Sequence, residues 1–248
     1  MGMKTIGVLG GMGPLATACF FQRIVEETRV DRDQDHVPVV LCCTPQISDR
    51  AAAILRHGVS PLRELTRALA RLESAEPDIV CMPCNTAHYW YEELARSSTV
   101  PFLHIVDAVL HELGEAIGPQ TPVGLIATDG TISAGIYPQR AAGLYAWRYP
   151  DETIVRSYIR PAIDLIKAGR STGAIPLVQN AIHHLIGDKH AGAIVLGCTE
   201  LSLVLEELDI DIPAIDSSTA LARWSIRHAI DHPDRPVRCG LGEVGECR

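Results

Sequence analysis

A repeated pattern constrains the fold of this chain more than any other feature of its sequence. Residues 79–86 (IVCMPCNT) resemble residues 193–200 (AIVLGCTE), and each run carries an apolar stretch into a cysteine, Cys84 or Cys198. Residues 6–10 resemble residues 123–127, with a glycine at the same place, and residues 100–107 resemble residues 212–216. Three matched segments in the same order and at similar spacing predict two halves of similar build.

Apolar runs alternate with helical patterns along the chain. Residues 4–9, 37–43 and 78–82 are short apolar runs, which predicts buried parallel strands. Helical spacing of apolar residues begins near residue 14 and recurs at 61–72 and 89–96. This alternation predicts an α/β fold with two similar parallel-sheet domains. We expect the first domain at residues 1–112 with a return of about 212–231, the second at 113–211, and a loosely ordered tail at 232–248.

The composition excludes several classes of protein. The 248 residues are 47% hydrophobic and 21% charged, which is typical of a globular chain and not of a disordered or collagen-like one. A net charge of −8 argues against a nucleic-acid partner, which would require a basic surface. Because no apolar run reaches the length of a membrane span and no signal peptide is recognisable, we expect a cytoplasmic protein without a membrane partner.

Two of the eight cysteines stand at equivalent points of the repeat. Cys84 and Cys198 each follow a predicted strand and precede a predicted helix. This position is the carboxyl end of a parallel strand, where open α/β sheets place their ligand sites. A helix N-terminus also favours the thiolate form of a nearby cysteine. Two such thiols facing each other across a cleft would be able to exchange a proton on opposite faces of one carbon atom.

The other cysteines have simpler interpretations. Cys81 and Cys84 form a C-x-x-C pair, a pattern of zinc sites and dithiol redox proteins. No second pair completes a zinc site, so the sequence predicts no metal, whereas dithiol redox chemistry stays open. The remaining cysteines are typical of small hydrophobic residues or lie in the tail: Cys19, Cys42, Cys43, Cys239 and Cys247.

Several motifs resemble those of the aspartate/glutamate racemase family, and most closely its aspartate racemases. They are GGMGP at 10–14, DQDH at 33–36, PQISDR at 45–50, PCNTAH at 83–88, ATDGT at 127–131 and GCTE at 197–200. The resemblance covers about residues 3–230. It implies two α/β domains related by a pseudo-twofold axis, with the active site in the cleft between them. It also implies that Cys84 and Cys198 act as the acid and base pair without pyridoxal phosphate, metal or other cofactor, and that the protein is a homodimer.

The expected reaction is the interconversion of L- and D-aspartate by a two-base mechanism. The resemblance places Arg50 and Lys167 on the side-chain carboxylate of the substrate, which a guanidinium and an ammonium group suit. The α-carboxylate is expected at helix starts, on Asn85, Thr86, Thr128 and Thr199.

Three further residues complete the expected site. Glu200 would orient Cys198 or contact the substrate ammonium, while Met12 and Ala87 would complete the pocket wall. For His88, a proton relay and a purely structural histidine both stay open.

Other functions remain compatible with the sequence. Glutamate or a broader set of amino acids is the alternative substrate, because one methylene changes selectivity by only about 1–3 kcal/mol. Outside racemases, the alternatives are a dithiol redox protein using Cys81 and Cys84, and a binding protein that captures an amino acid without reacting with it.

Overall fold

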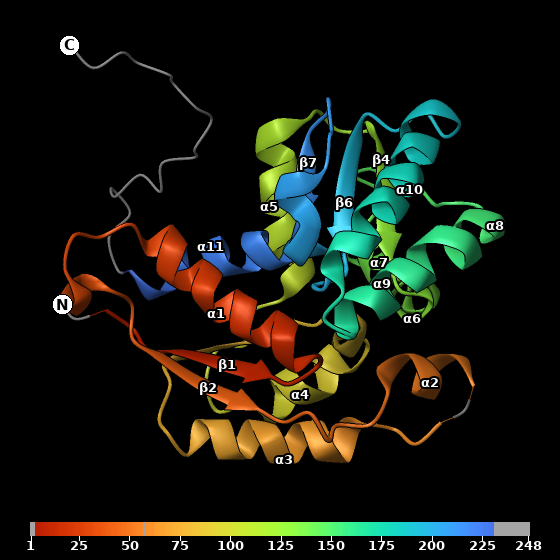
Figure 1. The fold of residues 1–248 in the computed structure, drawn as a ribbon. Coiled ribbons are helices and arrows are strands. Elements are labelled where there is room, and N and C mark those ends of the chain that lie inside the picture. Colours follow the sequence, from red (N-terminus) through yellow and green to blue (C-terminus); the bar gives the residue numbers. More distant parts are fainter. Residues whose placement is uncertain (1–2, 57, 231–248) are drawn as a thin grey trace, which may run out of the picture.

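The first sheet is built from the apolar runs of the N-terminal half. A computed structural model describes residues 3–56 and 58–230 (Figure 1). In it, β1 (Ile6–Gly10) lies between β2 (Val39–Cys43) and β3 (Ile79–Cys81), and both neighbours pair with it in parallel. All five residues of β1 are buried, as expected of the central strand of a sheet covered by helices.

The strand β2 departs from the prediction of a buried strand. It forms the edge of the three-stranded sheet, its residues alternate between partly buried and exposed, and the Leu41 side chain is 39% exposed. The prediction was wrong on burial because an unbroken apolar run does not distinguish an edge strand from a central one.

The second sheet repeats the topology of the first. Its order is β5 (Ala146–Arg148), β4 (Pro122–Ala127), β6 (Ala193–Gly197) and β7 (Ala214–Asp216), and all pairs are parallel. The counterpart of β7 in the first half is a single parallel bridge between Val80 and Phe102, which matches the pairing of Ile194 with Ala214. The molecule is therefore an α/β protein with two similar parallel-sheet units, as the internal repeat predicts.

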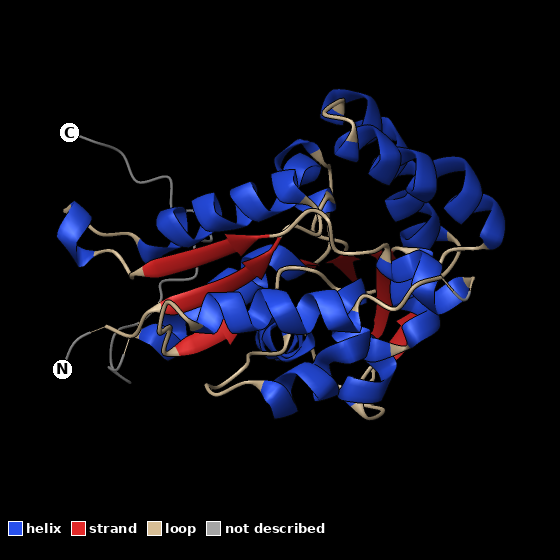
Figure 2. Ribbon diagram, turned by 90° about the horizontal axis from the view of Figure 1, so that it is seen from below, coloured by secondary structure: helices blue, strands red, loops and turns tan. Residues whose placement is uncertain are grey.

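Helices cover the faces of both sheets (Figure 2). In the first half they are α1 (Pro14–Thr28), the 3-10 helix η1 (Asp33–Asp35), α2 (Arg50–Leu55), α3 (Leu62–Glu73), the 3-10 helix η2 (Thr86–Trp90), α4 (Tyr91–Ser97) and α5 (Ile105–Ala116). In the second half they are α6 (Asp129–Ala134), α7 (Ile136–Ala141), α8 (Glu152–Ile154), the π-helix η3 (Val155–Ile159), α9 (Arg160–Lys167), the 3-10 helix η4 (Ser171–Ala174), α10 (Ile175–Gly187), the 3-10 helix η5 (Leu201–Glu207) and α11 (Ser217–Ala229).

The last helix of each half packs on the sheet of the other half. Helix α5 follows the first sheet but contacts β7 and α7, while α11 follows β7 but contacts α1, β1 and β3 (Figure 1). The two helices also pack against each other, and the Lys4 N–H donates to the Ala229 carbonyl at 2.9 Å. This exchange ties the two halves together through two continuous helices.

The expected boundaries can be placed on this arrangement. A division between residues 112 and 113 falls inside α5. Of the segment expected to return to the first half, β7 pairs with the second sheet, whereas α11 contacts β1 and β3 of the first. The expected tail at 232–248, with Cys239 and Cys247, lies outside the described residues. Within the described ranges, no helix combines the length and apolar character needed to cross a bilayer.

Candidate active site

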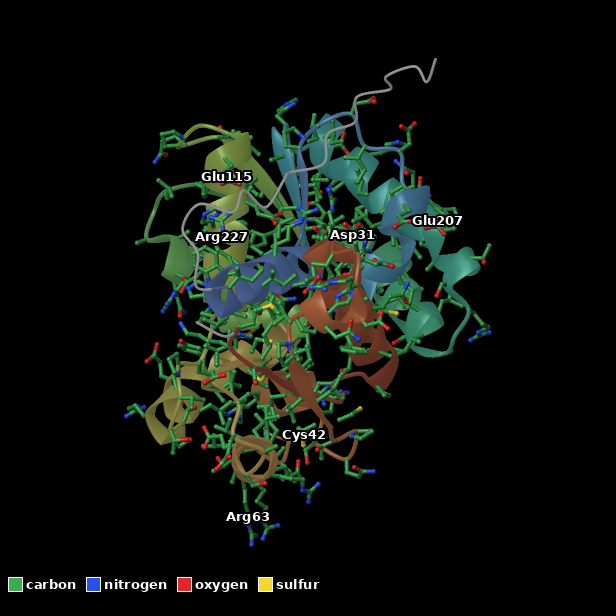
Figure 3. The ribbon with its side chains drawn as sticks, turned by 90° about the vertical axis from the view of Figure 1, so that its left-hand side faces the viewer. Asp31, Cys42, Arg63, Glu115, Glu207 and Arg227 are labelled. Atoms are coloured by element: carbon green, nitrogen blue, oxygen red, sulfur yellow. The ribbon has the colours of Figure 1, made fainter. Side chains whose placement is uncertain are left out.

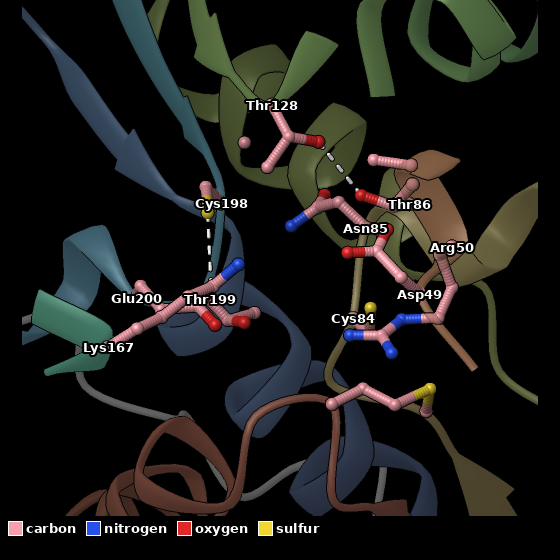
Figure 4. A pocket seen from close by; sticks show the side chains of 13 residues that line it. Asp49, Arg50, Cys84, Asn85, Thr86, Thr128, Lys167, Cys198, Thr199 and Glu200 are labelled. Atoms are coloured by element: carbon pink, nitrogen blue, oxygen red, sulfur yellow. Dashed lines mark hydrogen bonds between the residues drawn. The ribbon is translucent and has the colours of Figure 1, made fainter. Parts of the chain in front are cut away.

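A pocket lies where the carboxyl ends of β1, β3, β4 and β6 converge (Figure 4). Ten of the eleven site residues that the sequence predicts lie on its wall, and Ala87 does not. The wall consists of Met12, Asp49, Arg50, Ala51, Cys84, Asn85, Thr86, Thr128, Lys167, Gly197, Cys198, Thr199 and Glu200. Both halves contribute, so the pocket exists only when the two sheets are held together.

Cys84 enters the pocket from the first half. It follows β3, precedes η2, and its side chain is only 5% exposed. Burial raises the pKa of its thiol, while the Arg50 guanidinium and the Ala87 backbone N–H, which hydrogen-bonds the sulfur, lower it. Ala87 therefore acts on the site through its main chain. Burial is the largest of these effects and keeps the pKa of the Cys84 thiol above its ordinary value, while the cation and the N–H donor stabilise the thiolate when it forms.

Cys198 enters from the second half, on the opposite side of the pocket (Figure 4). It is 4% exposed, and its thiol donates a hydrogen bond to Glu200 Oε2 at 3.1 Å. Burial raises the pKa of this thiol well above its ordinary value, and the Glu200 carboxylate raises it further, while Lys167 lowers it. The two cysteines thus lie in different electrostatic surroundings, and Cys198 is suited to the protonated form.

Glu200 has a second oxygen available. The residue is 6% exposed, and Oε1 is buried without a hydrogen-bond partner among the described residues. A buried carboxylate oxygen without a donor is costly, unless a ligand supplies one. A ligand with an N–H or ammonium donor would satisfy this oxygen.

Arg50 reaches the pocket from the first turn of α2. The helix begins because the Asp49 side chain accepts a hydrogen bond from the Ala52 N–H at 2.8 Å, an N-cap that is common for aspartate. Arg50 Nη1 donates to the carbonyls of Ile47 and Ser48, whereas its Nε is buried without a partner among the described residues. The guanidinium is therefore held in place with part of its donor set unused.

Three predicted carboxylate ligands, Asn85, Thr86 and Thr128, have their side chains engaged with other side chains. Asn85 donates to Ser217 Oγ at 2.9 Å and accepts from the Tyr137 hydroxyl at 2.6 Å. The hydroxyls of Thr86, Thr128 and Thr131 form a triangle with sides of 2.8–3.0 Å. These bonds join the first half to the second, so these side chains serve first as a connection across the cleft.

His88 has both ring nitrogens occupied. Its Nδ1 lies 2.9 Å from the Cys84 carbonyl oxygen, and its Nε2 accepts the Ile105 N–H at 3.1 Å. This pairing requires the neutral tautomer with hydrogen on Nδ1. Burial lowers the pKa of His88 to about 4. No ring nitrogen is left to relay a proton, so the structural interpretation holds.

The dithiol alternative receives no support from the surroundings of Cys81. Its side chain belongs to the core formed with Ile6 and Phe20, whereas Cys84 packs in the core that contains Leu9 and Met12. Burial raises the pKa of Cys81 to about 12, and a thiol of that kind is a poor nucleophile. Within residues 3–56 and 58–230, no three His, Cys, Asp or Glu side chains gather as metal ligands.

Sequence reasoning missed three residues of the pocket wall: Asp49, Ala51 and Gly197. Each is a direct neighbour in sequence of a predicted residue, Arg50 or Cys198. Their position next to Arg50 or Cys198 in the sequence is the signal that could have found them. A loop or first helical turn that presents one side chain to a ligand also presents atoms of the neighbouring residues.

Two parallel-sheet halves that each bring a buried cysteine to one shared pocket define an α/β protein with a small-ligand site between its halves. Residues 9–224 match the family of Asp/Glu/hydantoin racemases. The chain belongs to this family.

Individual relatives agree with this placement. An aspartate racemase from Picrophilus torridus is 32% identical, has a TM-score of 0.78, and the match covers 91% of this chain and 94% of that one. The broad specificity amino-acid racemase RacX of Bacillus subtilis (strain 168) is 30% identical over 234 residues, 89% of this chain and 96% of the relative. An aspartate racemase homologue from Pyrococcus horikoshii OT3 shares the fold, with 22% identity, a TM-score of 0.75 and coverage of 92% and 99%.

Proposed function

We propose that this protein is an amino-acid racemase that needs no cofactor, that it acts on aspartate, and that Cys84 and Cys198 are its two catalytic bases. The observation that carries the proposal is the placement of one buried cysteine from each half on opposite sides of a single pocket. Racemisation requires a group on each face of Cα, and a pair of thiols at repeated positions supplies them.

The different surroundings of the two sulfurs assign their roles. Cys84, beside Arg50, reacts in its thiolate form and removes the α-proton, which leaves a planar enediolate-like intermediate. Cys198 starts as the thiol, whose S–H is hydrogen-bonded to Glu200, and it donates its proton to the opposite face of Cα. The reaction ends with Cys84 protonated and Cys198 as thiolate, and the same steps run backward for the other enantiomer.

The pocket also offers partners for the charged groups of an amino dicarboxylate. Arg50 and Lys167 bind the carboxylates as cations, and Glu200 Oε1 binds the ammonium group. Because the cysteines are almost completely buried, bound substrate is kept from water, and the fixed charges act more strongly on the developing enediolate.

Aspartate is the favoured substrate for two reasons. The pocket provides two cations, which suits an amino acid with two carboxylates, and among these the relative from Picrophilus torridus, at 32% identity, is an aspartate racemase. A broader specificity is the second candidate, and the match to RacX supports it. Comparing kcat/KM for aspartate, glutamate and alanine decides between them. Aspartate should exceed alanine by about tenfold or more, because alanine lacks the second carboxylate, and glutamate by about tenfold, because of its extra methylene.

Single cysteine variants test the mechanism. Cys84→Ala and Cys198→Ala should each abolish conversion of L- to D-aspartate and of D- to L-aspartate. Cys42→Ala, a variant of a partly buried cysteine away from the pocket wall, is the matched control and should keep its activity. Substantial turnover in both directions by either pocket variant would contradict the two-base scheme. A homodimeric state, which the family resemblance implies, stays a prediction for analytical ultracentrifugation.

A further inference from the structure

We propose that Gly130 is a positioning residue whose missing side chain lets α2 dock across the cleft and so holds Arg50 in the pocket. The inference rests on the proposed function, because it concerns how Arg50 reaches the substrate. It also gives a physical role to the ATDGT motif at residues 127–131, in which Gly130 follows two polar residues.

Helix α2 packs between the two halves. It follows β2 in the chain, yet it contacts α6 of the second half as well as η2 of the first (Figure 1). Ala53 and Ile54 pack partly buried against the core of the first half, and none of the six residues is fully buried. The side of the helix that faces α6 is formed by small groups, so its docking there depends on how closely they fit.

The fit is tightest at Gly130. A Cβ atom built on Gly130 would lie 2.9 Å from Ala51 Cα, 2.9 Å from Thr86 Cγ2 and 3.0 Å from Ala51 Cβ. These distances are shorter than van der Waals contacts between carbon atoms. The Ala51 atoms belong to the α2 helix itself, and Thr86 is buried and hydrogen-bonded to Thr128 and Thr131. Neither neighbour has a flexible side-chain end that would yield.

Arg50 is the residue immediately before Ala51, so a displacement of α2 moves the guanidinium. The Nε of Arg50 is buried in this arrangement, and the guanidinium charge acts on the Cys84 sulfur. A methyl group added to Gly130 would push Ala51 away. Arg50 would move with it, away from both the substrate carboxylate and Cys84. Gly130 thereby controls a cation supplied by the other half of the protein.

Two variants introduce the same clash from opposite sides. Gly130→Ala adds a methyl group on α6, and Ala51→Val adds bulk on α2, where no residue is buried and the folded core is not at risk. Two matched controls repeat the substitutions on exposed helical positions: Gly114→Ala, where the nearest atom lies 3.9 Å from the added Cβ, and Ala70→Val on α3. The wild type is assayed first for racemisation of aspartate.

Both variants should raise KM for aspartate about tenfold or more, while the controls stay near the wild type. The acid limb of the pH profile of kcat/KM should also move to higher pH, by about half a unit or more, because Cys84 loses the neighbouring cation. In an Arg50→Ala background, Gly130→Ala should change KM by less than about twofold, since both changes remove the same group.

The outcomes separate the inference from the proposed function. A wild-type protein that does not racemise aspartate contradicts the proposed function, whatever the variants do. An active wild type with an unchanged KM and pH profile in Gly130→Ala and Ala51→Val contradicts the inference alone. Fully additive effects of Gly130→Ala and Arg50→Ala also contradict it, because they would mean that Gly130 acts through Thr86 or another group.

Discussion

Cys198 donates its S–H hydrogen to Glu200 at 3.1 Å, whereas Cys84 has the guanidinium of Arg50 beside it. The repeat supplies two equivalent cysteines, and their neighbours make them chemically different (Figure 4; Figure 3 shows the side chains of the whole molecule). The Glu200 carboxylate raises the pKa of Cys198 further, whereas the Arg50 guanidinium acts to lower that of Cys84, so Cys84 is the sulfur better placed to form a thiolate.

Glu200→Gln should move the basic limb of the pH profile of kcat/KM to lower pH. The Glu200 carboxylate raises the pKa of Cys198, so a neutral amide allows this thiol to lose its proton earlier as pH rises. Glu207→Gln, at an exposed position of η5, is the control. An unmoved basic limb in Glu200→Gln would show that this carboxylate does not act on the catalytic thiol.

Arg50→Ala should raise KM for aspartate by about 10- to 100-fold, the range expected from losing a charge-assisted hydrogen bond of about 1.5–3 kcal/mol. Arg50→Lys keeps the charge but not the guanidinium fork, and we expect it to fall between the wild type and the alanine variant. Steady-state kinetics with both enantiomers measures this order. Wild-type KM in Arg50→Ala would remove Arg50 from the substrate site.

Tyr137→Phe should lower the free energy of unfolding by about 1–3 kcal/mol. The Tyr137 side chain is fully buried and its hydroxyl donates to Asn85 Oδ1 at 2.6 Å, so the variant leaves that oxygen without this donor. Tyr145→Phe is the control, because its hydroxyl has no hydrogen-bond partner among the described residues. Equal denaturant midpoints for the two variants would contradict a stabilising role for the contact across the cleft.

The pH dependence of stability should report His88. Its pKa is about 4 in the folded protein against 6.5 as the ordinary value, so between these values the unfolded state binds more protons. The contribution of neutral His88 to the free energy of unfolding is fully present above pH 6.5, and about 3 kcal/mol of it is lost as the pH falls to 4.

The variant His88→Asn isolates this contribution. Its free energy of unfolding should depend less steeply on pH between 6.5 and 4 than that of the wild type, and His190→Asn, at an exposed site, should keep the wild-type slope. Urea denaturation at several pH values measures both slopes. Identical slopes in the wild type and His88→Asn would show that His88 is not buried as a neutral ring.

Local patterns in the sequence predict the strands and the positions of Cys84 and Cys198. A buried strand needs a run of apolar residues, and the end of that run shows where the strand ends. They do not predict which sheet α5 and α11 contact, because an apolar helix face can pack on any apolar surface within reach. For the same reason the docking of α2 on Gly130 was not predictable. The engagement of Asn85 with Ser217 joins residues 132 positions apart, and nothing local marks such a pair.

The most direct test of the two-base mechanism follows hydrogen at Cα. The protein is incubated without cofactor in D₂O with L-aspartate, and separately with D-aspartate, and both enantiomers are analysed at early times. We predict that the product enantiomer carries deuterium at Cα while the remaining substrate keeps its protium, because one thiol removes the proton and the other, equilibrated with solvent, supplies deuterium. Deuterium entering the remaining substrate as fast as product forms, or protium retained in the product, would contradict the account.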